Sequence, residues 1–322
     1  MTSLSSQWTL KLKEMALRHG FMGVGISKAE RLDDEAKQLE AWLSRGYHGE
    51  MSYMANHFEM RVDPRKLVPG AKSVVSLMYN YFPGTEEVQL TTHDSRLTVH
   101  DSSFKISKYA FGEDYHKVVR RKLKELVKEL KQVVGDFHGR VFVDSAPVME
   151  RDWAKRSGQG WIGKNTLLIH PKKGSYFFLA EIILDIELEY DHPMRDHCGT
   201  CTKCIDACPT EAISPEGYIL DGSKCISYLT IELKSNIPSA FKGKMEDWIF
   251  GCDICQDVCP WNRFSKPHQE PAFEMNENVK ELKKEDWFEL TAEIFDTIFE
   301  KSAVKRAGFQ GIKRNIEFVQ KK

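Results

Sequence analysis

All eight cysteines of this 322-residue chain lie between Cys198 and Cys259. The first four follow the spacing Cys-x2-Cys-x2-Cys-x3-Cys-Pro, which holds 4Fe–4S clusters in bacterial ferredoxins. Three thiolates at three-residue spacing can wrap one face of a cubane, whereas the fourth points to a second cubane. Two structural zinc sites are the alternative, but zinc usually uses separated Cys-x2-Cys pairs. The pattern therefore favours two 4Fe–4S clusters and one-electron transfer.

Eight cysteines complete two sets of four, and the crossed spacing rule predicts how they divide. The second run is Cys252-x2-Cys255-x3-Cys259-Pro260, with Cys225 upstream. The ligands expected at the first cluster are Cys198, Cys201, Cys204 and Cys259. Those expected at the second cluster are Cys208, Cys225, Cys252 and Cys255. Cys225 departs most from the ferredoxin pattern, because its gap to the next cysteine is longer than in a compact repeat.

Asp144 is the candidate for acid–base chemistry. It ends the apolar run Arg-Val-Phe-Val-Asp and precedes Ser-Ala-Pro147, where an aspartate is commonly a turn residue or a helix cap. A carboxyl at the end of a buried strand is also partly desolvated, which would raise its pKa and let it donate a proton. Histidines at positions 116, 138 and 170 show no ligand spacing, so we expect structural roles for them.

The segment from Gly158 to Lys164 matches the letters of a dinucleotide-binding turn and nearly those of a P-loop. Such a turn must follow a strand and open a helix. Here a helical segment precedes the glycines and an apolar strand follows them. We therefore expect a glycine-rich turn and no nucleotide site.

Around these residues, apolar spacing predicts alternating helices and strands over residues 1–190. The expected helices cover residues 5–19, 31–45 and 114–134, and the expected strands cover 73–81, 140–144, 166–170 and 176–188. We expect an α+β chain in three parts. They are an α/β domain (1–190), a ferredoxin-like module (191–265) and a short helical, basic tail (266–322).

Composition and local sequence patterns exclude several classes of protein. Hydrophobic residues make up 41% and charged residues 29%, an ordinary balance for a globular chain. No run approaches the roughly 18 apolar residues of a membrane span, and the N-terminus has no secretory pattern. We therefore expect a cytoplasmic protein with reduced thiols and no membrane partner.

Several segments together resemble one known family, the epoxyqueuosine reductases of queuosine-tRNA synthesis. Those segments are Arg61-x2-Pro64-x2-Leu67-x-Pro69-Gly70-Ala71-x-Ser73-Val74, Lys108-Tyr109-Ala110-x-Gly112-x-Asp114-Tyr115-His116, Asp144-x2-Pro147-x2-Glu150-Arg151, Gly160-Trp-x-Gly163-Lys164-Asn165, the first cysteine run, Cys225-Ile-Ser-Tyr-Leu-Thr-Ile-Glu232 and Gly251-Cys-Asp-Ile-Cys-Gln-Asp-Val-Cys-Pro-Trp-Asn262. The resemblance covers nearly the whole chain.

The resemblance implies a cobalamin-binding N-terminal domain related to that of reductive dehalogenases. It also implies reduction of epoxyqueuosine to queuosine at the tRNA wobble position, with electrons passing through two 4Fe–4S clusters to cobalamin and Asp144 supplying a proton. By motif position, the candidates for cobalamin contact are Arg61, Lys108, Tyr109, Asp144, Lys164, Asn165 and Ser227. The Asp-x-His-x-x-Gly signature of histidine-ligated cobalamin proteins is absent from the sequence.

A tRNA partner requires a positive surface. Residues 301–322 carry seven Lys or Arg against one Glu, and the tRNA-binding candidates are Lys301, Lys305, Arg306, Lys313 and Arg314. We further expect a monomer that receives electrons from a flavodoxin- or ferredoxin-like donor. The alternatives are a cobalamin-dependent reductive dehalogenase, and a ferredoxin-type electron carrier that binds no corrinoid.

Overall fold

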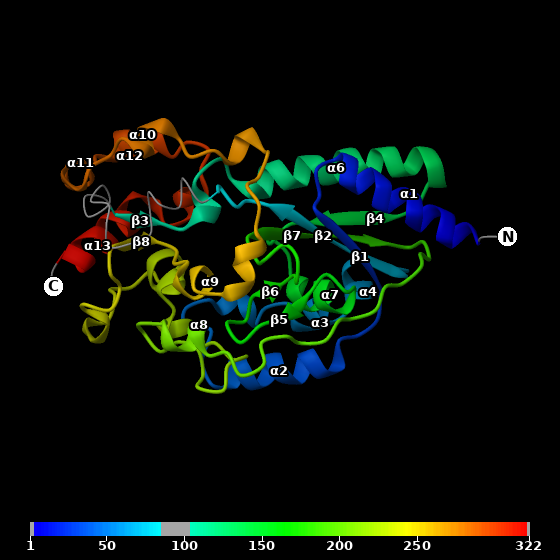
Figure 1. Ribbon diagram of the computed structural model, residues 1–322, viewed down its shortest axis with the longest axis horizontal. Coiled ribbons are helices and arrows are strands. Elements are labelled where there is room, and N and C mark those ends of the chain that lie inside the picture. The colour runs from blue at the N-terminus through cyan, green and yellow to red at the C-terminus, as the bar shows by residue number, and fades with distance from the viewer. Residues whose placement is uncertain (1–2, 85–103, 321–322) are drawn as a thin grey trace.

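A computed structural model describes residues 3–84 and 104–320 (Figure 1). Its main sheet has the strand order β1-β2-β7-β4, and every neighbouring pair is antiparallel. Those strands are β1 (Gly23–Lys28), β2 (Ser73–Asn80), β7 (Phe177–Leu184) and β4 (Gly139–Phe142). Antiparallel pairing confirms an α+β fold. The central strands β2 and β7 are buried on both faces because both faces of the sheet are covered.

Helices α1 (Leu4–Arg18) and α6 (Tyr115–Val134) pack on one face of the sheet (Figure 1). The apolar stripe of α6 is fully buried there, as its 3.6-residue periodicity requires. Helix α7 (Glu150–Arg156) covers the opposite face. Three further helices lie in the same N-terminal part, namely α2 (Asp33–Ser44), α3 (Phe58–Val62) and α4 (Pro64–Leu67).

Two short strand pairs accompany the main sheet. They are β3 (Lys105–Ile106) with β8 (Trp248–Phe250), and β5 (Trp161–Ile162) with β6 (Leu168–Ile169). The cysteine-rich region itself contains β8 and the one-turn helices α8 (Lys203–Asp206) and α9 (Ile254–Asp257). The glycine-rich turn at 158–163 does connect a helix to a strand, as expected.

Four helices form the C-terminal segment, namely α10 (Glu277–Lys280), α11 (Lys284–Phe288), α12 (Ala292–Ile298) and α13 (Gly308–Gln320). They do not stand apart from the rest of the chain. One hydrophobic cluster joins Ile106 of β3, Phe250 of β8 and Ile316 of α13. The three expected parts therefore share core residues across their boundaries. Within the described residues, no helix has the length and apolarity that a membrane span requires.

Two details differ from the sequence-based expectation. Strand β1 was not predicted, because Gly23 and Gly25 weaken the strand pattern. Gly25 is needed there, since a Cβ at that position would meet the backbone oxygen of Ser157 at 2.2 Å. Strand β4 ends at Phe142, so Asp144 lies in a loop and not in the strand.

Candidate functional site

The four thiols expected at the first cluster lie together. Cys198, Cys201, Cys204 and Cys259 line a single cavity. The pKa of Cys204 is raised to about 11, first by burial and then by the neighbouring thiols of that set. Each thiolate of a cubane binds a different iron, so ligands that surround a hollow suit a cluster.

The other four thiols gather in a second group. The pKa of Cys255 is raised by burial and then by Cys225 and Cys208. The pKa of Cys252 is raised by burial, with Cys225 and Cys255 adding to it. The structure thus brings the distant Cys225 beside its expected partners. Cys204 also acts on Cys255, so the two groups adjoin each other.

The donor set around the sulfurs fits iron–sulfur clusters. The Trp161 indole N–H donates to the Cys198 sulfur at 3.4 Å, and the Ala212 backbone N–H donates to the Cys208 sulfur at 3.4 Å. Such bonds stabilise charge on cluster sulfurs and tune their reduction potential. Thiols and N–H donors at both groups are therefore suited to hold a cubane each.

Three of the cobalamin candidates make their contacts within the cysteine module. Lys164 donates to the carbonyls of Gly199 at 2.8 Å and Cys201 at 3.1 Å. Asn165 donates to the Cys255 carbonyl at 3.3 Å, and Ser227 hydrogen bonds with the Cys225 thiol. Their partners indicate that they shape the cluster loops, and their contact with cobalamin stays a prediction.

Lys108, another cobalamin candidate, lies in a buried ionic network. Its ammonium is 2.7 Å from Asp257 and 3.4 Å from Asp253, and its side chain is almost fully buried. Ser107 donates to Asp253, and Tyr176 donates to Asp257. The two aspartates flank Cys255, so Lys108 ties the N-terminal part to the second cysteine loop.

Asp144 lies where helix α6 begins. The Tyr115 hydroxyl donates to its Oδ2 at 2.5 Å, and the His116 Nε2 lies 3.5 Å from the same oxygen. Asp114 caps α6 and orients His116, accepting from its backbone N–H at 3.0 Å and contacting its Nδ1 at 2.7 Å. The Tyr115 ring stacks on His116 with centroids 4.1 Å apart, which fixes both side chains.

The charge state of Asp144 differs from the sequence-based expectation. Burial does raise its pKa, but hydrogen bonds from His116 and Tyr115 outweigh burial and hold the pKa below the ordinary value. Burial lowers the pKa of His116, yet its bonds to Asp114 and Asp144 raise it to about 9. At neutral pH Asp144 is therefore ionised and the proton resides on His116. The sequence analysis expected a structural role for His116. Its place in the family motif Asp114-Tyr115-His116 was the signal that could have identified it as a site residue.

Asp144 is also open to solvent. Its side chain is 57% exposed, although burial by the surrounding residues is still the largest influence on its pKa. Tyr53 and Arg306 both interact with its charge. Arg61 donates to the Tyr53 carbonyl at 3.0 Å, and its buried Nε has no hydrogen-bond partner among the described residues.

The surroundings of Asp144 fit a cobalamin better than the other candidate positions do. The corrin ring is large and carries amides around its rim, so it needs polar donors along one side. Arg61 offers an unpartnered buried donor, and the half-buried Tyr109 lies against Tyr115 with ring centroids 6.0 Å apart. Arg61, Tyr109 and Asp144 are therefore the cobalamin candidates that the structure connects to one another.

The predicted tRNA-binding residues do not form one free cationic face. Arg306 pairs with Glu232 at 2.6 Å. Arg314 donates to the carbonyls of Leu229, Leu233 and Ser235 at 2.9, 2.6 and 2.7 Å. The Arg314 guanidinium therefore stabilises the fold.

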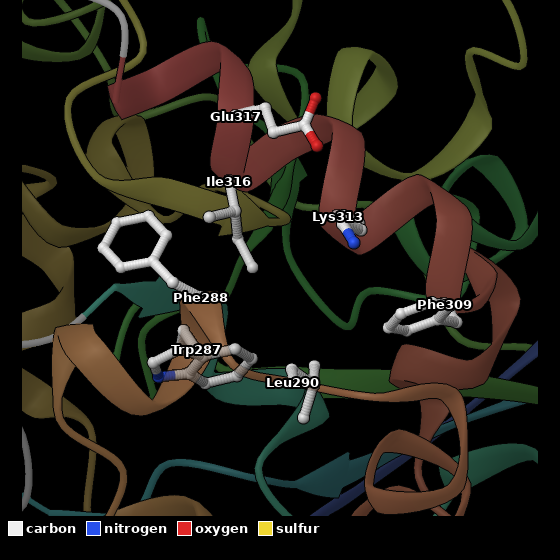
Figure 2. Close-up of a pocket in the computed structure, with 7 residues that line it drawn as sticks. All are labelled: Trp287, Phe288, Leu290, Phe309, Lys313, Ile316 and Glu317. Atoms are coloured by element: carbon white, nitrogen blue, oxygen red, sulfur yellow. The ribbon is translucent and has the colours of Figure 1, made fainter.

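The other three predicted tRNA-binding lysines are exposed on the C-terminal segment. Lys305 pairs with Asp296 at 3.1 Å. The backbone carbonyl of Lys301, and not its ammonium, accepts the hydrogen bond from the Asp114 N–H. Lys313 borders a pocket between α11 and α13, next to Phe309 (Figure 2). That pocket contains aromatic and aliphatic side chains and none of the groups of the Asp144 site.

Comparisons with known proteins agree with this architecture. Residues 197–262 match the family model of a 4Fe-4S double cluster binding domain. The fold and the thiol groups therefore define the class, which is an iron–sulfur oxidoreductase with two 4Fe–4S clusters. Residues 61–145 match the family model described as epoxyqueuosine reductase QueG, DUF1730.

Individual relatives narrow the class to one family. An epoxyqueuosine reductase of Leadbetterella byssophila is 57% identical over 97% of this chain and 98% of its own. This chain belongs to the epoxyqueuosine reductase family.

Two solved structures of the family are also similar. One is an epoxyqueuosine reductase with an epoxyqueuosine-modified tRNA-Tyr stem loop, with a TM-score of 0.86, 32% identity, and coverage of 97% of this chain and 80% of that one. The other is the Bacillus subtilis enzyme with its catalytic aspartate loop swung out of the active site. Its TM-score is 0.85 at 31% identity, with coverage of 97% and 81%.

Proposed function

We propose that this protein reduces epoxyqueuosine to queuosine at the wobble position of a tRNA anticodon. The observation that carries the proposal is the presence, in a chain of this family, of two four-thiol groups and a carboxylate paired with a protonated imidazole. Conversion of an epoxide to an alkene and water consumes two electrons and two protons and breaks both C–O bonds of the epoxide. The thiol groups hold the clusters that transfer the electrons, and the Asp144 site donates protons.

The cofactors of this reaction are two 4Fe–4S clusters and cobalamin. When bound, the clusters supply single electrons and cobalamin supplies a nucleophilic metal centre. The eight cysteines hold the clusters in the two sets described above. Arg61 and Tyr109 would hold the cobalamin next to Asp144.

Asp144 and His116 act as a proton-donating pair. Cleavage of the first C–O bond leaves an alkoxide, which is a far stronger base than a carboxylate. His116 holds a proton 3.5 Å from Asp144 at neutral pH, so Asp144 passes a proton to the alkoxide while His116 replaces it. We infer that the Asp144 loop is the counterpart of the loop that swings out in the Bacillus subtilis relative.

The substrate is a tRNA that carries epoxyqueuosine, and exposed lysines of the C-terminal segment contact its phosphates. A flavodoxin- or ferredoxin-like protein delivers electrons to the clusters. The protein acts as a monomer in the cytoplasm, where its thiols stay reduced.

The test is anaerobic reconstitution with iron, sulfide and cobalamin, followed by mass analysis of nucleosides from epoxyqueuosine-containing tRNA. We expect queuosine from the native protein. Asp144→Asn should lower turnover by roughly 10²–10⁴-fold, because general acid help is lost, while iron and cobalamin contents stay unchanged. Asp136→Asn, at an exposed position, is the control. Native turnover in Asp144→Asn would remove that residue from the chemistry.

A second assay separates the alternatives. Turnover of a halogenated small molecule, with none on tRNA, would favour a reductive dehalogenase. Failure to retain any corrinoid would favour an electron carrier.

A further inference from the structure

The loop that carries Asp144 has a strained backbone. It leaves the sheet after β4 and enters α7 at Glu150. Asp144 adopts φ +49°, a left-handed conformation that is uncommon for a residue with a side chain. Its backbone N–H donates to Oε1 of Glu150 at 2.6 Å. Strained conformations persist only where neighbouring groups hold them, so the Glu150 carboxyl is a candidate holder.

A second carboxyl lies behind Glu150. Glu181 sits in the middle of β7, opposite Phe142 of β4 and Ser76 of β2. It is fully buried, and no N–H or hydroxyl donor of the described residues reaches either of its carboxyl oxygens, whose side-chain contact is with the carboxyl of Glu150. Its pKa is raised far above the ordinary value, first by burial and then by the charge of Glu150. The two carboxyls therefore face each other.

Two adjacent carboxyls, one fully buried and one half-buried, cannot both be ionised at neutral pH. Burial, and then the charge of Asp144, raise the pKa of Glu150 to about 8. The pair therefore keeps at least one proton at neutral pH. A shared proton gives Glu181 the hydrogen bond that a buried carboxyl needs, because burial without a bond is costly.

We propose that Glu150 and Glu181 form a carboxyl pair that holds the Asp144 loop in its active position. Glu181 donates its proton to Glu150, and Glu150 accepts the backbone N–H of Asp144. Both are positioning residues, since they act on the reaction only through Asp144. The effect of this pair on the reaction rests on the proposed role of Asp144. The contact between Glu150 and the Asp144 backbone N–H does not depend on that role.

Hydrogen exchange of the reconstituted protein tests this contact directly. The readout is the exchange rate of the Asp144 amide within a peptide spanning residues 143–149, with a peptide from α6 as internal reference. Glu181→Leu removes the donor to Glu150, and Glu150→Met removes the acceptor for Asp144. Each should speed exchange at residues 143–149 at least tenfold and lower kcat tenfold or more, with little change in KM.

Glu181→Gln is the matched control. Its amide N–H still donates to Glu150, so protection of residues 143–149 should be retained. Unchanged exchange in both Glu181→Leu and Glu150→Met would overturn the proposal, and so would equal loss of protection in Glu181→Gln and Glu181→Leu. If Glu181→Leu does not fold, Glu150→Met decides alone. Full activity of Asp144→Asn would disprove the catalytic role of Asp144. If the Glu150 and Glu181 variants still changed the exchange rates as expected, the carboxyl pair would nevertheless be confirmed as the group that holds the loop.

Discussion

At the scale of single residues, neighbours set the charge of the Asp144 site. An aspartate after a buried strand would ordinarily be harder to ionise because burial disfavours the charged form. Tyr115 and His116 reverse that outcome by donating to the carboxylate. Both come from the first turn of α6, where the Asp114 cap orients the imidazole. The site is therefore a charged pair that carries a mobile proton.

His116→Gln tests this pair through pH. The folded pKa of His116 is about 9 against an ordinary 6.5, so its stabilising contribution is complete below pH 6.5 and is lost as pH rises through 9. We expect the native protein to exceed His116→Gln by about 1–2 kcal/mol in unfolding free energy at pH 6, and by almost nothing at pH 10. Native turnover should also decline as pH rises through 9.

Chemical or thermal unfolding of both proteins at several pH values measures the difference. His138→Gln, at an exposed position, is the control. A difference between native protein and His116→Gln that stays constant from pH 6 to pH 10 would contradict a charged His116.

At the scale of elements, α13 is attached to the cysteine module by polar contacts from its inner face. Asn315 is fully buried and donates to the carbonyls of Thr230 and Ile249, both at 2.8 Å. Arg314 donates to three carbonyls of the turn that follows Cys225. Helix α13 therefore supports the turn that carries the expected cluster ligand Cys225. It is part of the folded core and not only the basic tail that the sequence predicted.

Arg314→Met should consequently destabilise the fold more than it weakens tRNA binding. Loss of charge-assisted hydrogen bonds to three carbonyls predicts a cost of about 2–4 kcal/mol. The salt dependence of tRNA affinity should stay unchanged, because Arg314 contacts protein and not phosphate. Thermal unfolding and tRNA titrations at several salt concentrations measure both effects, with Lys313→Met as the control. A shallower salt slope with native stability would restore Arg314 to the tRNA surface.

At the scale of the whole molecule, the parts are joined where electrons must pass. The Lys108 network links the N-terminal part to the loop of Cys255, and one hydrophobic cluster extends from β3 to α13. Burial of an ion pair gives little net stability, but removal of one partner is strongly destabilising, which makes such a network a good clamp. The positive charge that remains for tRNA is carried by exposed lysines.

Lys305→Glu tests that surface. Lys305 is exposed and pairs only with the exposed Asp296 among the described residues, so its charge is available to a phosphate. Loss of one phosphate contact should make the slope of log affinity against log salt shallower by about 0.9. Affinity should fall several-fold at low salt and converge with the native value at high salt. Lys242→Glu, an exposed lysine of the cysteine module, is the control, and identical slopes for both variants would exclude Lys305.

Elements with strong local signals were predictable from the amino-acid sequence. Apolar periodicity located α1, α2, α6, β2 and β7 to within a few residues, because each buries a continuous stripe or a whole strand. Cysteine spacing predicted two sets of four thiols, because a cubane imposes its geometry on a short run of chain. The family motifs identified Asp144 as the candidate proton donor and indicated the reduction of epoxyqueuosine.

How those residues act depends on contacts that form only in the folded protein. Whether Asp144 is charged depends on Tyr115 and His116, which lie almost thirty positions earlier and meet it only in the fold. Arg314 and Lys108 were expected to contact ligands, but the fold gives their charges partners within the protein. Glu181 carries no sequence signal beyond a charge in an apolar run. Partners distant in sequence set the pKa and the free hydrogen-bonding capacity of a group, so the three-dimensional arrangement alone determines them.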